Sequence, residues 1–218
     1  MRRTEWVKRF ALLLPGSFFM GLGVALTKCA ELGLSTISSV PNILSLRFSF
    51  FSLGTFAAIW NYVMLLAQVL ILKKDFKPIQ LLQIPVSMLF GYCTDFGVFL
   101  FSALPLGAYL WKLIACLLGI ALLGFGISLT VISGTVMNPG EALVKVIADK
   151  TGKDFGTVKI AFDFFCVVLA AMLSLLFFPF RILGIREGTV LAVFGTGLCV
   201  KIFTKICEKP LTCWFRKR

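Results

Sequence analysis

The sequence predicts an all-α integral membrane protein with six transmembrane helices, arranged as two inverted three-helix repeats that each carry a short interfacial or re-entrant helix. Three observations lead to this prediction: an apolar composition, six long apolar runs, and a pattern that recurs in the two halves. Hydrophobic residues make up 59% of the chain and charged residues only 15%, whereas a soluble domain carries about 25% charged residues. No polar stretch is long enough for a second domain, so residues 1–218 are expected to form a single membrane domain.

Six apolar runs are long enough to cross a bilayer, for which a helix needs about 20 residues. They lie at about 9–30, 52–72, 78–101, 106–132, 156–178 and 185–206. Most of the 22 Lys and Arg residues fall on one side of these spans, and the positive-inside rule makes that side the cytoplasm. We therefore expect a multi-pass protein of the cytoplasmic (inner) membrane with both termini in the cytoplasm. Its first partner is the lipid bilayer. The uneven distribution of Lys and Arg across the membrane explains the net charge of +12 without nucleic-acid binding.

Two short polar segments interrupt the apolar runs. In the second half, Asn138 is a good N-cap, Pro139 suits the first helical position, and Glu141 completes a capping-box-like start. The resulting helix at 139–151 is too short to span, so it lies at the interface or re-enters between the spans. Its counterpart in the first half lies at about 38–47, on the outer side.

Self-similarity predicts the repeat. Three patterns recur in the same order at nearly constant offset: "GLGVALT" at 21–27 as "GFGISLT" at 124–130, "LGTFAAIWN" at 53–61 as "FGTVKIAFD" at 155–163, and "LFG" at 89–91 as "VFG" at 193–195. Repeat one then covers about 10–101 and repeat two about 106–206. Because three spans are an odd number, the second repeat is inverted relative to the first, as in transporters whose site lies near the midplane. Duplication kept for assembly alone is the alternative.

A family resemblance follows from these motifs. The GxG-containing first span, the N-P-G-E start of the short helix, the passage "TGKDFGTVKIAFD" and the repeated layout resemble the YczE/YyaS/YitT family of bacterial multi-pass membrane proteins. The resemblance covers roughly residues 10–206, and Gly156 with Asp163, preceded by the N-P-G-type turn, is its most specific part. It implies an inner-membrane location and a transport role, and it names no substrate.

Asp163 is the most distinctive polar residue. It lies about 10 Å into the fifth span at 1.5 Å per residue, which places it near the centre of the bilayer. A carboxylate facing lipid there costs at least about 2.5–3.5 kcal/mol, so it should face a partner or a wet cavity. We predict a substrate-binding or coupling site formed by this residue and its repeat equivalent, Asn61, with Asn138, Glu141, Gly156 and Gly54. The alternative is an Asp–Asn or Asp–backbone hydrogen bond that only holds helices together.

Other residues in the spans are predicted to be structural. Asp95 and Lys112 each lie about six residues from the tight turn between the third and fourth spans, which predicts an interhelical ion pair. Small residues let helices approach closely, which predicts packing of the first helix against the fourth through Gly21, Gly23, Gly124 and Gly126. These glycines do not form a dinucleotide loop, because that would need a preceding strand.

The residue inventory argues against an enzyme. The chain contains no histidine, no H-E-x-x-H and no P-loop, so we predict no catalytic residues, no metal and no cofactor. The leading function is a permease for an unknown small molecule, and a polar cavity at Asn61 and Asp163 would favour it. The alternative is a non-transporting membrane partner protein or the substrate-binding subunit of a larger uptake complex, which a sealed apolar core would favour. Whether the partner is a second copy of the chain or another membrane protein is left open.

Overall fold

The computed structural model describes residues 3–178 and 183–216, which form eight α-helices and no strand. In chain order the helices are α1 (Arg3–Cys29), α2 (Thr36–Arg47), α3 (Leu53–Leu72), α4 (Gln83–Phe101), α5 (Tyr109–Ser133), α6 (Pro139–Thr151), α7 (Phe155–Phe177) and α8 (Glu187–Arg216). Two 3₁₀ turns, η1 (Lys73–Asp75) and η2 (Pro78–Leu82), join α3 to α4. Within these described ranges six helices are long and apolar enough to cross a membrane, which confirms the predicted number of spans.

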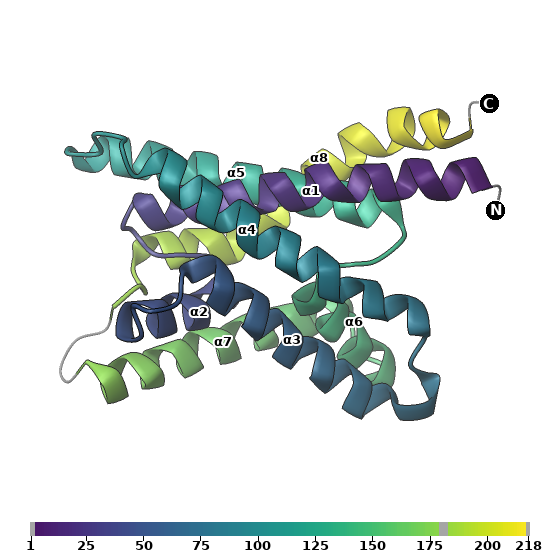
Figure 1. Ribbon diagram of the computed structural model, residues 1–218, viewed down its shortest axis with the longest axis horizontal. Helices are drawn as coiled ribbons and strands as arrows, with labels where there is room; N and C mark the ends of the chain where they lie inside the picture. Colours follow the sequence, from purple (N-terminus) through teal and green to yellow (C-terminus); the bar gives the residue numbers. More distant parts are fainter. Residues whose placement is uncertain (1–2, 179–182, 217–218) are drawn as a thin grey trace.

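The helices form two groups, which Figure 1 shows as an upper and a lower row. In the first group α1 lies between α4 and α5, and α5 lies between α1 and α8. In the second group the short helices α2 and α6 lie beside the long helices, α2 against α7 and α6 against α3. The groups meet chiefly where α3 packs against α4, and no comparably extensive contact joins α7 to α8 in the described ranges.

Glycines allow α1 and α5 to cross closely. A Cβ atom on Gly23 would lie 2.5 Å from the backbone nitrogen of Leu123, and one on Gly126 would lie 2.6 Å from the backbone nitrogen of Met20. No side chain fits at such distances without moving a backbone. These two glycines therefore pack the first spanning helix against the fourth, as the sequence predicts.

The other two glycines of the predicted set pack different helices. Gly21 faces Cys93 on α4, and Gly124 faces Cys199 on α8. Two residues along a helix correspond to about 200° of rotation, so neighbours at spacing two cannot face the same partner. The prediction of close packing is confirmed for all four glycines, but the assigned partner helix was wrong for these two.

The outer surface suits a lipid environment. Phe99, Phe164 and Leu176 are each more than 70% exposed, although all three lie on predicted spans. Large apolar side chains would be costly in water, and they match the hydrocarbon of a bilayer. Apolar side chains therefore fill the interior of the protein and also cover the outer surface that suits lipid.

Candidate functional site

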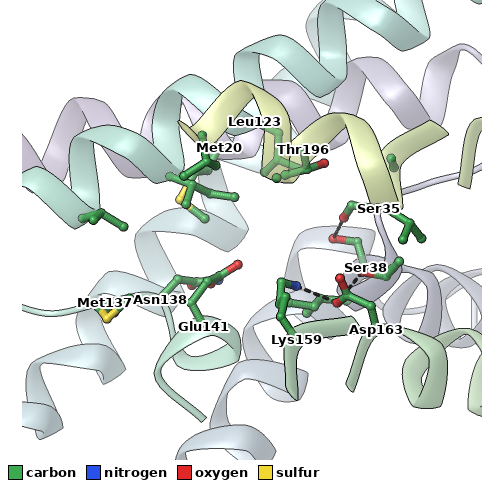
Figure 2. A pocket seen from close by; sticks show the side chains of 18 of the residues that line it. Met20, Ser35, Ser38, Leu123, Met137, Asn138, Glu141, Lys159, Asp163 and Thr196 are labelled. Atoms are coloured by element: carbon green, nitrogen blue, oxygen red, sulfur yellow. Dashed lines mark hydrogen bonds and ion pairs between the residues drawn. The ribbon is translucent and has the colours of Figure 1, made fainter. Parts of the chain in front are cut away.

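A cavity of about 860 Å³ lies between the two helix groups, and each of the eight described helices contributes to its lining. This volume is within the range of about 300–1,000 Å³ that is usual for small-molecule sites. One wall is apolar and consists of side chains from α1, α4 and α5: Met20, Val24, Phe90, Leu123 and Ile127. Polar side chains from α2, α3, α6 and α7 form the opposite wall, part of which Figure 2 shows. The cavity therefore combines a large apolar surface with a few polar groups.

Asp163 has two partners on one oxygen atom. Its Oδ1 accepts a hydrogen bond of 2.8 Å from Thr36 Oγ1 and an ion-paired bond of 2.6 Å from Lys159 Nζ, both drawn in Figure 2. Thr36 is the first residue of α2, and Lys159 lies one turn before Asp163 on α7. The carboxylate is buried, with 5% of the residue exposed. It thus ties α2 to α7 and borders the cavity at the same time, and its partners are not those that the sequence suggested.

Four buried polar atoms in the cavity lining have no hydrogen-bond partner among the described residues. They are Trp60 Nε1, Asn61 Nδ2, Glu141 Oε2 and Thr196 Oγ1. Asn61 is 2% exposed and Glu141 is 8% exposed, so bulk solvent does not reach most of either side chain. Leaving such a group unsatisfied costs about 1–3 kcal/mol, and native proteins normally satisfy it with water, an ion or a ligand. These atoms are the clearest sign of a binding site.

The start of α6 differs from its predicted capping box. Asn138 makes no side-chain cap hydrogen bond, and Glu141 Oε2 has no partner. Two bonds to backbone oxygens hold this helix start instead: the Ala142 nitrogen donates to the Asn138 oxygen at 2.9 Å, and the Gln68 side chain on α3 donates through Nε2 to the Pro139 oxygen at 3.0 Å. In Figure 2, Asn138 and Glu141 lie on the left of the polar wall and Lys159 and Asp163 on its right, with open space between them. Their side chains therefore line the cavity.

The structure brings five of the six predicted site residues to this cavity. Asp163, Asn61, Asn138, Glu141 and Gly156 all line it. Gly54 lies elsewhere, against α4, where a Cβ would clash with the carbonyl oxygen of Gly91. It is a packing position, because only a glycine lets α3 and α4 approach this closely.

The predicted ion pair between Asp95 and Lys112 is not formed. Asp95 accepts hydrogen bonds from Ser52 Oγ at 2.5 Å and from the Gly54 nitrogen at 2.8 Å, and Lys112 Nζ lies 2.5 Å from Glu31 Oε2. The short turn between α4 and α5 suggested that these helices are neighbours. They are not, because α1 lies between them. Asp95 instead stabilises the start of α3.

Sequence reasoning missed several polar residues of the interior. Lys159 could have been recognised from its i,i+4 spacing to Asp163, which puts both on one helix face. No pattern in the sequence identifies Thr36 as a partner of Asp163. Gln68 and Gln83 are almost fully buried and exchange hydrogen bonds of 3.1 and 3.2 Å, which ties α3 to α4 near the start of α6. The two lie on different helices, so no periodicity relates them.

The cavity runs from this buried interior to an exposed mouth. Exposed charged residues complete its lining at the C-terminal half of α6, at the α6–α7 connection and on α8: Lys145, Asp149, Lys153 and Lys201. The mouth therefore carries more positive than negative charge. From this charged mouth the cavity extends inward to Glu141 and Asp163.

Comparisons with known proteins give a family and no activity. No curated protein and no solved structure matches the chain. The sequence pattern of one protein family, DUF6198, matches residues 7–205, a range that includes every residue of the cavity lining. The chain belongs to this family, which is described as a family of unknown function.

Proposed function

We propose that this protein is a small-molecule carrier of the cytoplasmic membrane, with its binding site in the central cavity between two inverted repeats. The observation that carries the proposal is a cavity of about 860 Å³ into which buried, unpartnered polar groups are built. A sealed apolar core would instead have favoured a protein that only binds a membrane partner. Asn61 and Asp163 both line the cavity, as a central site requires.

The cavity lining supports the inverted repeat. Many of its members are repeat equivalents, separated by 102 to 104 residues along the chain: Met20 and Leu123, Val24 and Ile127, Ser35 and Asn138, Ser38 and Glu141, Asn61 and Asp163, Phe90 and Phe194. A pseudo-twofold axis through the cavity would bring such pairs together. The two carboxylates in these pairs, Glu141 and Asp163, come from the second repeat, and their equivalents in the first repeat, Ser38 and Asn61, are neutral.

The crossing of α1 and α5 supports the same axis. Gly23 faces Gly119 and Leu123, and its repeat equivalent Gly126 faces Gly16 and Met20, which are the repeat equivalents of those two partners. In a twofold contact residue i meets j while the equivalent of i meets the equivalent of j. The observed contacts follow this rule.

The two repeats differ in the contact between their last two spanning helices, which is where a carrier would move. In the first repeat α3 and α4 are in contact at Gly54 and Gly91, whereas their equivalents Gly156 and Gly195 lie apart, with part of the cavity between α7 and α8. A rocking motion of one helix group against the other would open α3–α4 and close α7–α8, which is the usual way for inverted repeats to alternate access. The glycines retained at 156 and 195 would permit that closure.

The charged mouth indicates to which side of the membrane the cavity opens. With the N-terminus in the cytoplasm, Lys145, Lys153 and Lys201 lie on the cytoplasmic side, and the contact between α3 and α4 closes the outer half. The described conformation would therefore be inward-facing.

Two-sided labelling tests the carrier. In a variant without the seven native cysteines, Asn61→Cys is treated with a membrane-impermeant thiol reagent from either side of sealed vesicles. We expect labelling from both sides, because a carrier exposes its central site to each side in turn. Lys74→Cys, in the exposed α3–α4 connection, is the matched control and should react from the cytoplasmic side alone. Labelling of Asn61→Cys from one side only would favour the partner-protein alternative.

A further inference from the structure

Three charged side chains lie deep in the cavity, and one of them has no counter-charge. Lys159 pairs with Asp163 at 2.6 Å, so these two neutralise each other. Glu141 forms no ion pair within residues 3–178 and 183–216, and its Oε2 has no hydrogen-bond donor. The inner cavity therefore carries one uncompensated negative charge.

A buried carboxylate without a partner is costly, because burial removes its hydration and nothing replaces it. Lys145 is one helical turn from Glu141 and could have neutralised it, but its side chain is exposed at the cavity mouth. Figure 2 shows the Glu141 side chain directed into the open space of the cavity. A positive charge brought by the solute would complete this site.

The surroundings fit an organic cation better than a metal ion. A metal such as Ca²⁺ takes six to eight oxygen ligands, and the described residues hold no group of three or more His, Cys, Asp or Glu side chains that could bind one. The cavity is also far larger than a metal ion needs: a single water molecule occupies about 30 Å³ in the liquid, whereas the cavity has a volume of about 860 Å³. Its wall of aliphatic side chains and the nearby ring of Trp60 suit an apolar body that carries an ammonium group.

We propose that the solute is an organic ammonium compound whose charged group binds Glu141 and whose apolar body packs on Met20, Leu123 and Ile127. This inference rests on the proposed carrier function and names its substrate class. Glu141 is the residue that selects the charge. Asp163 stays paired with Lys159 when the solute binds.

Fluorescence of Trp60 tests this assignment. In a purified variant in which Trp6, Trp111 and Trp214 are replaced by Phe, Trp60 is the single reporter, and benzyltrimethylammonium is titrated as the probe. Its neutral carbon isostere, neopentylbenzene, has the same shape without the charge, and phenylacetate supplies an anion. We expect the cation to bind at least tenfold more tightly than either, and Glu141→Gln to remove that preference without changing the affinity for neopentylbenzene.

Glu208→Gln is the matched control, because it makes the same chemical change at an exposed glutamate of α8 that does not line the cavity. Its cation affinity should stay within twofold of the parent. Equal losses in Glu141→Gln and Glu208→Gln, no binding of the cation, or equal binding of cation and isostere would each overturn the cation site. None of these results would by itself decide whether the protein is a carrier, which the labelling at position 61 tests separately.

Discussion

At the residue scale, the contacts of Asp163 suit both a structural role and the proposed binding role. Asp163 receives its hydrogen bond and its ion pair on Oδ1, and the residue also borders the cavity. The bond from Thr36 holds α2 in place, which is a structural role. In the proposed carrier, the ion pair with Lys159 would neutralise a positive charge that otherwise faces the solute, which is an electrostatic role.

The substitution Asp163→Asn separates these roles. An amide oxygen still accepts from Thr36, so we expect the fold to survive with a small change in melting temperature. The charge that neutralises Lys159 is lost, so the proposed carrier should take up an organic ammonium solute into vesicles more than tenfold more slowly. Thr36→Val is the control for structure: it removes one hydrogen bond, costs about 0.5–1.5 kcal/mol, and keeps the ion pair. Normal uptake by a well-folded Asp163→Asn protein would show that the charge is not needed.

At the element scale, the crossing of α1 and α5 holds the first helix group together. In a membrane there is little hydrophobic driving force between helices, so close packing of small residues supplies much of their association. The crossing is built from glycines and Thr side chains on both helices: Gly16 lies against Thr130, and Gly119 lies against Thr27. Helix approach at this place depends on the absence of side chains.

Gly23→Ala tests this contact. The added Cβ would lie 2.5 Å from a backbone atom of α5, which cannot move as a flexible side chain can. We expect a loss of about 1–3 kcal/mol in the free energy of unfolding, measured by denaturation in mild detergent. Gly197→Ala on α8 is the control, since nothing lies within 4 Å of its added Cβ and alanine favours a helix by up to about 1 kcal/mol. An unchanged free energy of unfolding in Gly23→Ala would contradict the described crossing of α1 and α5.

At the scale of the whole molecule, the arrangement of the helices predicts which loops share a side of the membrane. Lys150 Nζ lies 2.8 Å from Asp75 Oδ2, so the end of α6 is next to the connection between α3 and α4. Both segments therefore face the same compartment, although some 75 residues separate them along the chain. The positive-inside rule predicts that this side faces the cytoplasm.

Labelling of single cysteines tests the topology. Lys74→Cys and Lys150→Cys should both react with an impermeant thiol reagent from the cytoplasmic side only, because an even number of spans separates them. Gly107→Cys, in the connection between α4 and α5, should react from the opposite side only; its position is open, with nothing within 4 Å of an added Cβ. External labelling at position 74 or 150 would refute the assignment of six spans with an internal N-terminus.

The sequence by itself determined the helices and most of their bounds. Runs of about 20 apolar residues predict spans, and the Asn-Pro start and Gly end of 139–151 agree with α6 (Pro139–Thr151). These signals are local, because capping and hydropathy act within a few residues. These signals were incomplete at the first and last helices. Helix α1 begins at Arg3, before the predicted start at 9, and α8 runs to Arg216, beyond the predicted end at 206, since a helix can extend past its apolar stretch.

Only the tertiary structure decided which residues meet. Position along a helix fixes the depth of a residue in the membrane but not the neighbour it faces. Asn61 and Asp163, which the sequence predicts to share a site, both line the cavity, whereas Asp95 and Lys112, also predicted at matched depth, are kept apart by α1. The partners of Asp163, the unpartnered oxygen of Glu141 and the open space between α7 and α8 all depend on contacts between distant segments, which no local pattern in the chain records.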